Sequence, residues 1–193
     1  LTDVNEQGGL VLAEEIGGDA LFVKHDVTSA EGWRQVLAAA EARFGAVNVL
    51  VNNAGILGPV EGIDSLSEEA YRKVCDINQV SVFLGMQTVI PSMLKAGQGS
   101  IVNISSVAGM VAIYGCPNLG YISSKFAVRG MTKQIAVDFG AKNIRANTIH
   151  PGFIKTPMMA AATDEGGGDA TTMIPMGRLA EPSEVSHLVI FLA

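Results

Sequence analysis

Short apolar runs alternate with longer amphipathic segments along the whole chain of 193 residues. Apolar runs of strand length lie at 20–24, 47–51, 100–104 and 144–149. Helical periodicity, with matching start or stop signals, covers 5–16, 29–45, 67–95, 118–141 and 181–193. Strands that alternate with helices in this way form βαβ units. We therefore predict one α/β domain over residues 1–193, a doubly wound parallel sheet in three α/β/α layers, with the strand at 47–51 buried on both faces.

The two ends of the chain interrupt this pattern. The chain begins with Leu1 and not with Met, and residues 1–3 have the character of a strand end that leads into a helix. It stops at Ala193, inside the periodic pattern of the last helix. We therefore expect a segment of a longer protein that is truncated at both ends.

The composition narrows the class of protein. Apolar residues make up 48% of the chain and charged residues 17%, which favours a compact domain over disorder. The net charge of −6, without a basic run, argues against nucleic acid as a partner. No apolar stretch approaches the ~20 residues that span a membrane, and no signal peptide is recognisable. We expect a cytoplasmic enzyme that binds neither nucleic acid nor membrane.

The cysteines and histidines give no sign of a disulfide or a metal. Cys75 and Cys116 lack the CxxC spacing of redox and zinc motifs, so we expect reduced thiols. His25, His150 and His187 are scattered and have no partners at ligand spacing. No metal site is predicted.

Polar residues follow the predicted strands at their carboxyl ends. They are Asp3, Asp26, the stretch 52–55, Ser105 with Ser106, and the stretch 150–152. In an open parallel sheet, ligands bind outside the carboxyl ends of the strands. Any one of these stretches could be an ordinary polar loop, but all of them fall on the edge where a ligand is expected.

A tyrosine and a lysine four residues apart lie on the predicted helix 118–141. Side chains at this spacing share one helix face, so the Tyr121 phenol and the Lys125 ammonium can meet. A nearby cation lowers the pKa of a phenol from about 10 toward neutrality, where tyrosine can exchange protons. One ammonium is not enough, so a second positive charge is expected. Taken alone, such a spacing is more often an amphipathic surface pair.

Five pieces of the chain together carry a family resemblance. They are Asn52-Asn53-Ala54-Gly55, Asn78, Ile104-Ser105-Ser106, Tyr121-Ile122-Ser123-Ser124-Lys125 and Pro151-Gly152-Phe153-Ile154-Lys155-Thr156. In this order and at these separations they resemble the short-chain dehydrogenase/reductase family, over essentially the whole chain. The resemblance implies a Rossmann-type fold. It also implies a Gly-rich phosphate turn before Leu1 and a final strand after Ala193, because Gly8-Gly9 lies within a helical pattern and is not that turn.

The resemblance implies a catalytic set of Ser106, Tyr121, Lys125 and Asn78. Tyr121 would be the general acid/base, and Lys125 would lower its pKa together with an oxidised nicotinamide ring. Ser106 would stabilise the substrate oxygen. Asn78 would sit where its helix loosens and relay protons to Lys125 through a water, or else it is a satisfied core amide. Ser106 precedes Tyr121 by two residues more than is commonest in the family, so either the loop at 113–118 is longer or Ser106 is out of register.

The resemblance also implies a dinucleotide site. The residues expected to contact the dinucleotide are Asp3, Asp26, Val27, Asn53, Ala54, Gly55, Tyr121, Lys125, Pro151, Gly152, Ile154 and Thr156. The Asp3 carboxylate would bind the adenosine ribose and repel a 2′-phosphate, so NAD is favoured over NADP. The alternative role of Asp3 is that of a helix N-cap. Without a Gly-rich turn, the segment is expected to bind dinucleotide poorly.

The stretch 153–176 loses periodicity and contains Gly166-Gly167-Gly168 and several methionines. We expect a mobile flap over the substrate, with the methionines as adaptable lining; a disordered polar insert is the alternative. The expected pocket residues are mostly apolar: Ile56, Leu57, Val107, Ile113, Tyr114, Met158 and Met159. Such a lining favours a ring or chain secondary alcohol.

The predicted function is NAD-dependent interconversion of a secondary alcohol and a ketone by hydride transfer. A catalytically silent binding or regulatory domain on the same fold is the alternative. An epimerase or dehydratase of nucleotide sugars is a third interpretation, but it would need a larger substrate domain. Helices 67–95 and 118–141 resemble the family's subunit interface, so a homodimer or homotetramer is expected.

Overall fold

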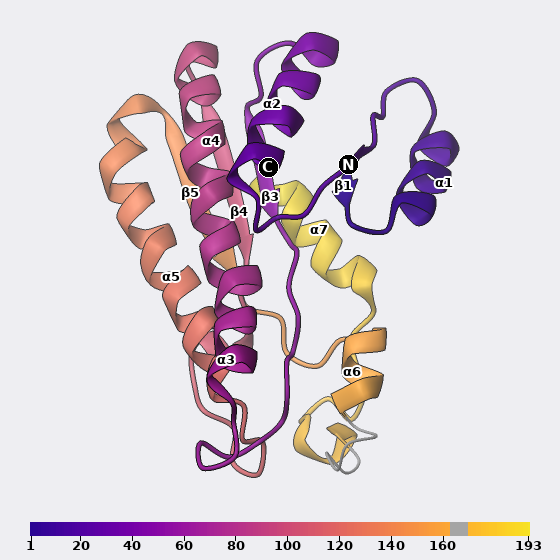
Figure 1. Cartoon of the computed structure of the whole chain (residues 1–193), viewed down its shortest axis with the longest axis vertical. Helices are drawn as coiled ribbons and strands as arrows, with labels where there is room; N and C mark the ends of the chain where they lie inside the picture. The colour runs from indigo at the N-terminus through magenta and orange to yellow at the C-terminus, as the bar shows by residue number, and fades with distance from the viewer. Residues whose placement is uncertain (163–169) are drawn as a thin grey trace.

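The structure, a computed structural model, describes residues 1–162 and 170–193 (Figure 1). Its elements, in chain order, are β1 (Thr2–Asp3), α1 (Glu6–Ile16), β2 (Val23–Lys24), α2 (Ala30–Phe44), β3 (Val49–Asn52), α3 (Glu68–Cys75), the π-helical turn η1 (Asp76–Val80), α4 (Ser81–Ala96), β4 (Gly99–Ile104), the 3-10 turn η2 (Val107–Gly109), α5 (Leu119–Phe139), η3 (Gly140–Lys142), β5 (Ile144–Ile149), α6 (Pro157–Ala162), η5 (Ala170–Met173) and α7 (Pro182–Leu192).

The strands pair in parallel within two sheets. β1 pairs with β2, and β4 lies between β3 and β5. Helices α2, α4 and α5 cover one face of the three-stranded sheet, and α7 contacts β4 and β5 (Figure 1). The predicted parallel α/β architecture is confirmed. The strand expected over 20–24 is shorter than predicted, because only Val23 and Lys24 pair with β1.

A buried cluster joins the helices to the three-stranded sheet. Its members are Trp33, Leu50, Val82, Met86, Val89, Ile90, Met93, Ile101, Val128 and Ile144. Beside it, the Asn52 amide donates to Asn103 Oδ1 at 2.8 Å, and Asn103 Nδ2 donates to Thr132 Oγ1 at 2.9 Å. These bonds satisfy polar groups that burial would otherwise penalise, and they connect β3 and β4 with α5.

Strand β3 alternates between buried and exposed residues, so the prediction that it is buried on both faces is wrong. Leu50 and Asn52 are buried, whereas Val49 and Val51 are 38% and 40% exposed. The strand pairs only with β4 in the described part of the chain, and α7 packs on β4 and β5. One face of β3 is therefore covered and the other is not.

The helix starts predicted from polar caps are confirmed. Ser29 Oγ accepts the Gly32 N–H at 3.0 Å, and Ser67 Oγ accepts the Ala70 N–H at 3.1 Å. Gly9 lies inside α1 and not in a turn, as predicted. A side chain on Gly9 would overlap the ring of Phe22, so glycine allows α1 to approach the segment before β2.

The helix predicted over 67–95 is divided by the π-helical turn η1. Asn78 lies in this turn, between α3 and α4. A π-helical turn forms i→i+5 hydrogen bonds, here from the Ser81 N–H to the Asp76 carbonyl. The helix is therefore locally widened at Asn78, where the family resemblance placed a loosened turn.

Candidate active site

The end of β4 and the start of α5 bring a serine, a tyrosine and a lysine together. Lys125 is only 4% exposed, and its Nζ donates to the Ile104 carbonyl at 2.9 Å. The same ammonium lies 5.5 Å from the centre of the Tyr121 ring. The Ser106 side chain, also buried, forms a hydrogen bond with the Tyr121 phenol. The tyrosine and lysine therefore do not form a solvated surface pair.

Burial sets the acidity of both titratable groups. It raises the pKa of Tyr121 above its ordinary value, and the hydrogen bond with Ser106 only partly opposes this. Burial also lowers the pKa of Lys125 to about 8. At neutral pH the lysine is still a cation and the phenol is still protonated. In the protein alone, desolvation outweighs the expected lowering of the Tyr121 pKa, so a phenolate requires further positive charge.

Two adjacent serines after β4 have different partners. Ser105 Oγ donates to the Lys125 carbonyl at 3.0 Å, which holds the second turn of α5 against the strand end. Ser106 Oγ accepts the Ala108 N–H at 3.1 Å and also contacts the phenol. Ser106, and not Ser105, therefore lies beside the phenol.

Asn78 is fully buried and has three hydrogen-bond partners. Its Oδ1 accepts the Ile56 N–H at 2.8 Å and its Nδ2 donates to the Ile56 carbonyl at 2.8 Å. Nδ2 also lies 3.3 Å from Ser124 Oγ. The side chain is satisfied, as the core-amide alternative requires. It fastens the loop after β3 to α5. Asn78 also lies in the widened turn that was expected for a proton relay to Lys125.

Gly55 lies between Asn78 and Lys125. A Cβ at this position would stand 3.2 Å from Asn78 Oδ1 and 3.5 Å from Lys125 Nζ. The backbone can pass between the two groups because glycine has no side chain. The preceding residues Asn53 and Ala54 are exposed. The stretch after β3 therefore reaches the same edge as Lys125.

Asp3, at the end of β1, is exposed and is oriented by a local turn. Its Oδ1 accepts the Asn5 N–H at 2.8 Å. The N-cap of α1 is Asn5, whose side chain accepts the Gly8 N–H. The alternative role of Asp3 as a helix N-cap is therefore wrong, and a carboxylate is presented at the strand end.

Asp26 and Val27, after β2, are held by their neighbours. Asp26 Oδ1 accepts from the N–H and the Oγ1 of Thr28 at 2.9 and 2.8 Å, and these bonds lower the pKa of Asp26. The Val27 carbonyl accepts from Trp33 Nε1 at 2.9 Å. An open hollow beside them is lined by Asp26, Thr28, Glu68, Glu69, Arg72, Lys73, Asp76 and Ile77.

The segment after β5 is tied to the end of β4. The Pro151 carbonyl accepts the Val107 N–H at 2.9 Å, next to Ser106. Farther along, Thr156 Oγ1 donates to the Ile154 carbonyl at 3.3 Å and accepts the Met159 N–H at 3.4 Å, at the start of α6. Gly152, between these contacts, is exposed. Residues 151–156 therefore run from the serine toward α6.

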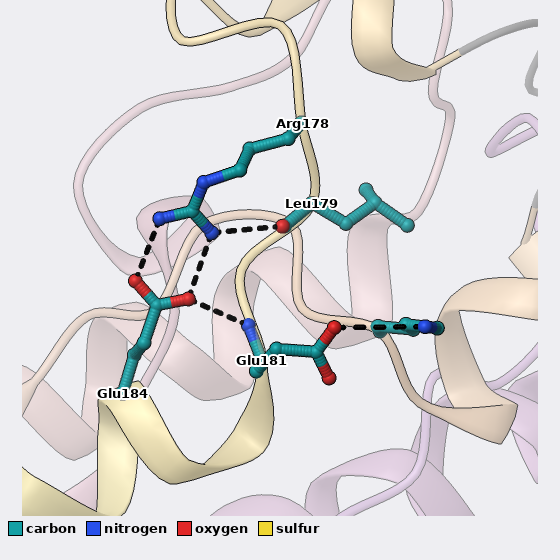
Figure 2. Close-up of polar contacts among 5 residues, drawn as sticks. Arg178, Leu179, Glu181 and Glu184 are labelled. Atoms are coloured by element: carbon teal, nitrogen blue, oxygen red, sulfur yellow. Dashed lines mark hydrogen bonds and ion pairs between the residues drawn. The ribbon is translucent and has the colours of Figure 1, made fainter.

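Ion pairs fasten the chain where it enters α7 (Figure 2). The Arg178 guanidinium makes a two-pronged pair with the Glu184 carboxylate at 2.8 and 2.9 Å. Glu184 also accepts the Glu181 N–H at 2.8 Å, and Glu181 lies 3.5 Å from Lys155 Nζ. Backbone hydrogen bonds from the Lys155 N–H to the Ala180 carbonyl at 2.9 Å and from the Ala180 N–H to the Phe153 carbonyl at 3.0 Å hold the beginning of the predicted flap against the segment that leads into α7.

The predicted flap is not wholly irregular. Helix α6 and the 3-10 turn η5 lie within residues 153–176, which the loss of periodicity did not predict. The glycines 166–168 lie outside the described residues. Closure of this segment over a substrate stays a prediction.

The expected substrate pocket is only partly assembled. Ile56 contributes to a hollow with Gly58, Pro59 and α3. Tyr114, in contrast, is fully exposed, and Met158 is 37% exposed. The assignment of Tyr114 to the pocket is wrong, because its ring lies in solvent.

Two side chains that the sequence did not assign to the site support it. His150 Nδ1 lies 2.9 Å from the Ser106 carbonyl and its Nε2 lies 2.9 Å from Thr148 Oγ1. Asn118 contacts both Tyr121 and Leu57. The sequence signals were the position of His150 in the polar stretch after its strand and that of Asn118 at a helix start, and neither assigned a role.

Residues 1–162 and 170–193 contain neither a candidate metal centre nor a candidate membrane span. No group of three or more His, Cys, Asp and Glu side chains there could hold a metal ion. No helix in this part of the chain combines the length and apolar character of a membrane span. Cys75 and Cys116 are both free thiols.

Comparison with known proteins matches the whole chain. A family model described as enoyl-(acyl carrier protein) reductase covers residues 1–193. The trans-4-hydroxycyclohexanecarboxylate dehydrogenase of Sinomonas cyclohexanicum is 43% identical over 204 residues, 100% of this chain and 74% of that protein. The 3-alpha-(or 20-beta)-hydroxysteroid dehydrogenase of Mycobacterium bovis is 40% identical over 191 residues, 99% of this chain and 70% of that protein. A gluconate 5-dehydrogenase from Burkholderia cenocepacia, solved with NADP and tartrate, has a TM-score of 0.90 at 30% identity, covering 100% of this chain and 76% of that one.

Proposed function

The chain belongs to the short-chain dehydrogenase/reductase family of oxidoreductases, and we propose that it interconverts a secondary alcohol and a ketone with NAD as its cofactor. One observation carries the proposal. The Ser106 hydroxyl, the Tyr121 phenol and the Lys125 ammonium converge beside the carboxyl end of β4. This is the edge of a parallel sheet where ligands bind.

Tyr121 moves the proton in this proposal. During alcohol oxidation its phenolate accepts the hydroxyl proton, and during ketone reduction its phenol donates a proton to the carbonyl oxygen. Ser106 Oγ accepts a hydrogen bond from Ala108, so its single hydrogen serves the Tyr121 phenol in the protein alone and can be donated to the substrate oxygen when a substrate is bound. Lys125 favours the phenolate electrostatically, and its burial strengthens that interaction by reducing solvent screening.

The residues at this edge fit a dinucleotide. A bound nicotinamide cofactor supplies the hydride acceptor or donor, and its oxidised ring supplies the further positive charge. Lys125 Nζ has three donor hydrogens, and the bond to Ile104 uses one of them, which leaves donors for a ribose hydroxyl. Gly55 leaves room beside that ammonium. The other residues proposed to contact the cofactor are Asp3, Asp26, Val27, Asn53, Ala54, Pro151, Gly152, Ile154 and Thr156.

The preference for NAD rests on Asp3. Its carboxylate is exposed at the end of β1 and would accept hydrogen bonds from the adenosine ribose hydroxyls. The same charge would repel a 2′-phosphate. The gluconate 5-dehydrogenase was solved with NADP, and the Asp3 carboxylate is the feature proposed to disfavour that cofactor in this chain.

Asn78 completes the proposed catalytic set. Its side chain binds both backbone groups of Ile56. The preceding residue, Gly55, lies between the Asn78 amide and the Lys125 ammonium. A proton route through a water between Asn78 and Lys125 stays a prediction.

The substrate proposed is a secondary alcohol on an apolar ring or chain. Apolar residues such as Ile56, Leu57 and Val107 adjoin the loops that meet at Tyr121 and Ser106. The two relatives are named for a hydroxycyclohexane carboxylate and for hydroxysteroids, which supports a ring alcohol.

We also propose that the chain self-associates as a homodimer or homotetramer through helices α4 and α5. Helix α4 exposes Phe83 and Leu94, and α5 exposes Phe126 and Val137, each by more than two fifths of its surface. Large exposed apolar side chains on neighbouring helices are typical of an interface. A dimer or tetramer would cover them, and its mass in solution can be measured by light scattering.

The test of the proposed function is turnover of ring secondary alcohols by the full chain, followed through the absorbance of reduced nicotinamide. We expect activity with NAD, and a loss of about a thousandfold in kcat for Tyr121→Phe with the affinity for NAD unchanged. Tyr114→Phe is the matched control, because Tyr114 is fully exposed. Near-normal turnover by Tyr121→Phe would exclude the proposed role of this residue.

A further inference from the structure

Asn118, the residue before α5, uses both polar atoms of its side-chain amide. It is 5% exposed. Its Oδ1 accepts the Tyr121 N–H at 3.0 Å, and its Nδ2 donates to the Leu57 carbonyl at 3.0 Å. The two partners fix the orientation of the amide, because an N–H requires an oxygen and a carbonyl requires a donor. A backbone bridge between Asn118 and Glu61 reinforces the contact with this loop.

The backbone of Tyr121 is held on both sides of its Cα atom. Asn118 binds its N–H, which lacks a partner within the first helical turn. The Tyr121 carbonyl accepts a hydrogen bond from Ser124 Oγ at 2.7 Å, and Asn78 Nδ2 lies 3.3 Å from the same hydroxyl. Asn118 therefore binds the Tyr121 N–H directly, and Asn78 is connected to the Tyr121 carbonyl through the Ser124 hydroxyl.

The same two asparagines hold consecutive residues of the loop after β3. Asn78 binds both backbone groups of Ile56, and Asn118 binds the carbonyl of Leu57. Neither contact touches the phenol, Ser106 or the ammonium. The loop and the first turn of α5 are nevertheless connected by side-chain hydrogen bonds at two points.

We propose that Asn118 is a positioning residue, which ties the backbone of Tyr121 to the loop at Leu57 and so keeps the phenol in place against Ser106 and Lys125. This inference rests on the proposed function, because it assigns Asn118 to the reaction of Tyr121. An ordinary helix cap needs only one acceptor oxygen, which Ser also provides. The second bond, to Leu57, requires the amide donor, so the two roles can be separated by mutation.

The experiment compares Asn118→Ala, which removes both bonds, with Asn118→Ser, which keeps a cap but not the amide donor. Ser67→Ala is the matched control, since it removes the equivalent cap of α3. We expect kcat to fall about tenfold to a hundredfold in Asn118→Ala and to remain several-fold low in Asn118→Ser, with a smaller change in KM for the alcohol. The pH–rate profile should move to higher pH as the phenol moves away from its cation.

A purely structural cap would behave differently. Full recovery of kcat and of the pH profile in Asn118→Ser would overturn the proposal. So would a loss of kcat in Ser67→Ala as large as that in Asn118→Ala.

Amide hydrogen exchange provides a test that does not need turnover. In Asn118→Ser, residues 57–61 should exchange about tenfold faster while the Tyr121 N–H stays protected by the serine cap. Unchanged protection of 57–61 would overturn the inference, even if the enzyme is active. An inactive wild-type chain would instead contradict the proposed function, and the exchange result would still decide whether Asn118 ties the loop to Tyr121.

Discussion

Lys125 places its ammonium 2.9 Å from the carbonyl oxygen of Ile104, inside the protein and with 4% of its surface exposed. No ion pair joins Lys125 to a carboxylate among the residues that the structure describes. One neutral carbonyl dipole only partly replaces the lost hydration of a buried cation. The folded protein therefore keeps Lys125 charged at a cost in stability, next to the phenol whose ionised form that charge would favour.

The contribution of Lys125 to the stability of the wild type should rise between pH 8 and pH 10.5. The pKa of Lys125 falls from 10.5 to about 8 on folding, because burial disfavours the ammonium. The unfolded chain binds more protons between these values, so the stability contributed by the neutral lysine is present above 10.5 and is lost as the pH falls to about 8. Below pH 8, burial of the charged Lys125 ammonium lowers the free energy of unfolding by about 3 kcal/mol.

Lys125→Met should therefore increase the free energy of unfolding at pH 7 by about 1–3 kcal/mol while lowering kcat by about a hundredfold or more. Denaturant unfolding at a series of pH values checks the first effect, and the variant should lack the rise above pH 8. Lys133→Met, on an exposed position of the same helix, controls for the loss of a lysine. A less stable Lys125→Met at pH 7 would mean that the bond to Ile104 outweighs the burial of charge.

Gly55→Ala should separate activity from stability. The new Cβ would stand 3.2 Å from Asn78 Oδ1 and 3.5 Å from Lys125 Nζ, so the amide must shift by a few tenths of an ångström. Alanine also restricts the unfolded chain, which offsets part of the strain by about 0.4–1 kcal/mol. We expect a loss of about tenfold in kcat with a change in unfolding free energy of about 1 kcal/mol or less.

Gly130→Ala is the control for this substitution. Gly130 lies within α5, and a Cβ there meets no atom within 4 Å. It should stabilise the helix by about 0.5–1 kcal/mol and leave kcat unchanged. If Gly55→Ala kept full activity, the narrow gap between Asn78 and Lys125 would have no importance for turnover.

The sequence predicted those features that depend on local spacing. The shared face of Tyr121 and Lys125 follows from helical periodicity, and the caps at Ser29 and Ser67 follow from the preference of helix starts for hydroxyl oxygens. The burial of β3 was mispredicted, because an apolar run does not reveal which of its faces a helix covers.

Other contacts could not be predicted, because they join distant parts of the chain. Asn118 binds a carbonyl 61 positions away, and His150 binds one 44 positions away. A local pattern identifies Asn118 as a cap but says nothing of Leu57. The rise in the pKa of Tyr121 also depends on burial in the folded protein, and sequence spacing alone suggested the opposite direction.

Asp3→Asn should relax the preference for NAD. Asparagine keeps an oxygen that can accept the Asn5 N–H, so the turn before α1 should be retained. It removes the charge that would repel a 2′-phosphate, and it replaces a strong acceptor of ribose hydrogen bonds by a weaker one. We expect kcat/KM to rise for NADP and to fall for NAD, changing their ratio by about tenfold or more, or about 1.4 kcal/mol.

Two comparisons show whether this effect comes from charge at the ribose. Asp19→Asn removes an exposed carboxylate elsewhere and should leave the ratio unchanged. Asp3→Ala removes the charge and also the acceptor for the Asn5 N–H. Any additional loss of kcat/KM with both cofactors therefore comes from the disturbed turn and not from the charge. Because screening weakens exposed charges, high salt should raise wild-type activity with NADP more than that of Asp3→Asn. An unchanged ratio in Asp3→Asn would show that this carboxylate does not face the adenosine ribose, and the preference for NAD would then lose its physical basis.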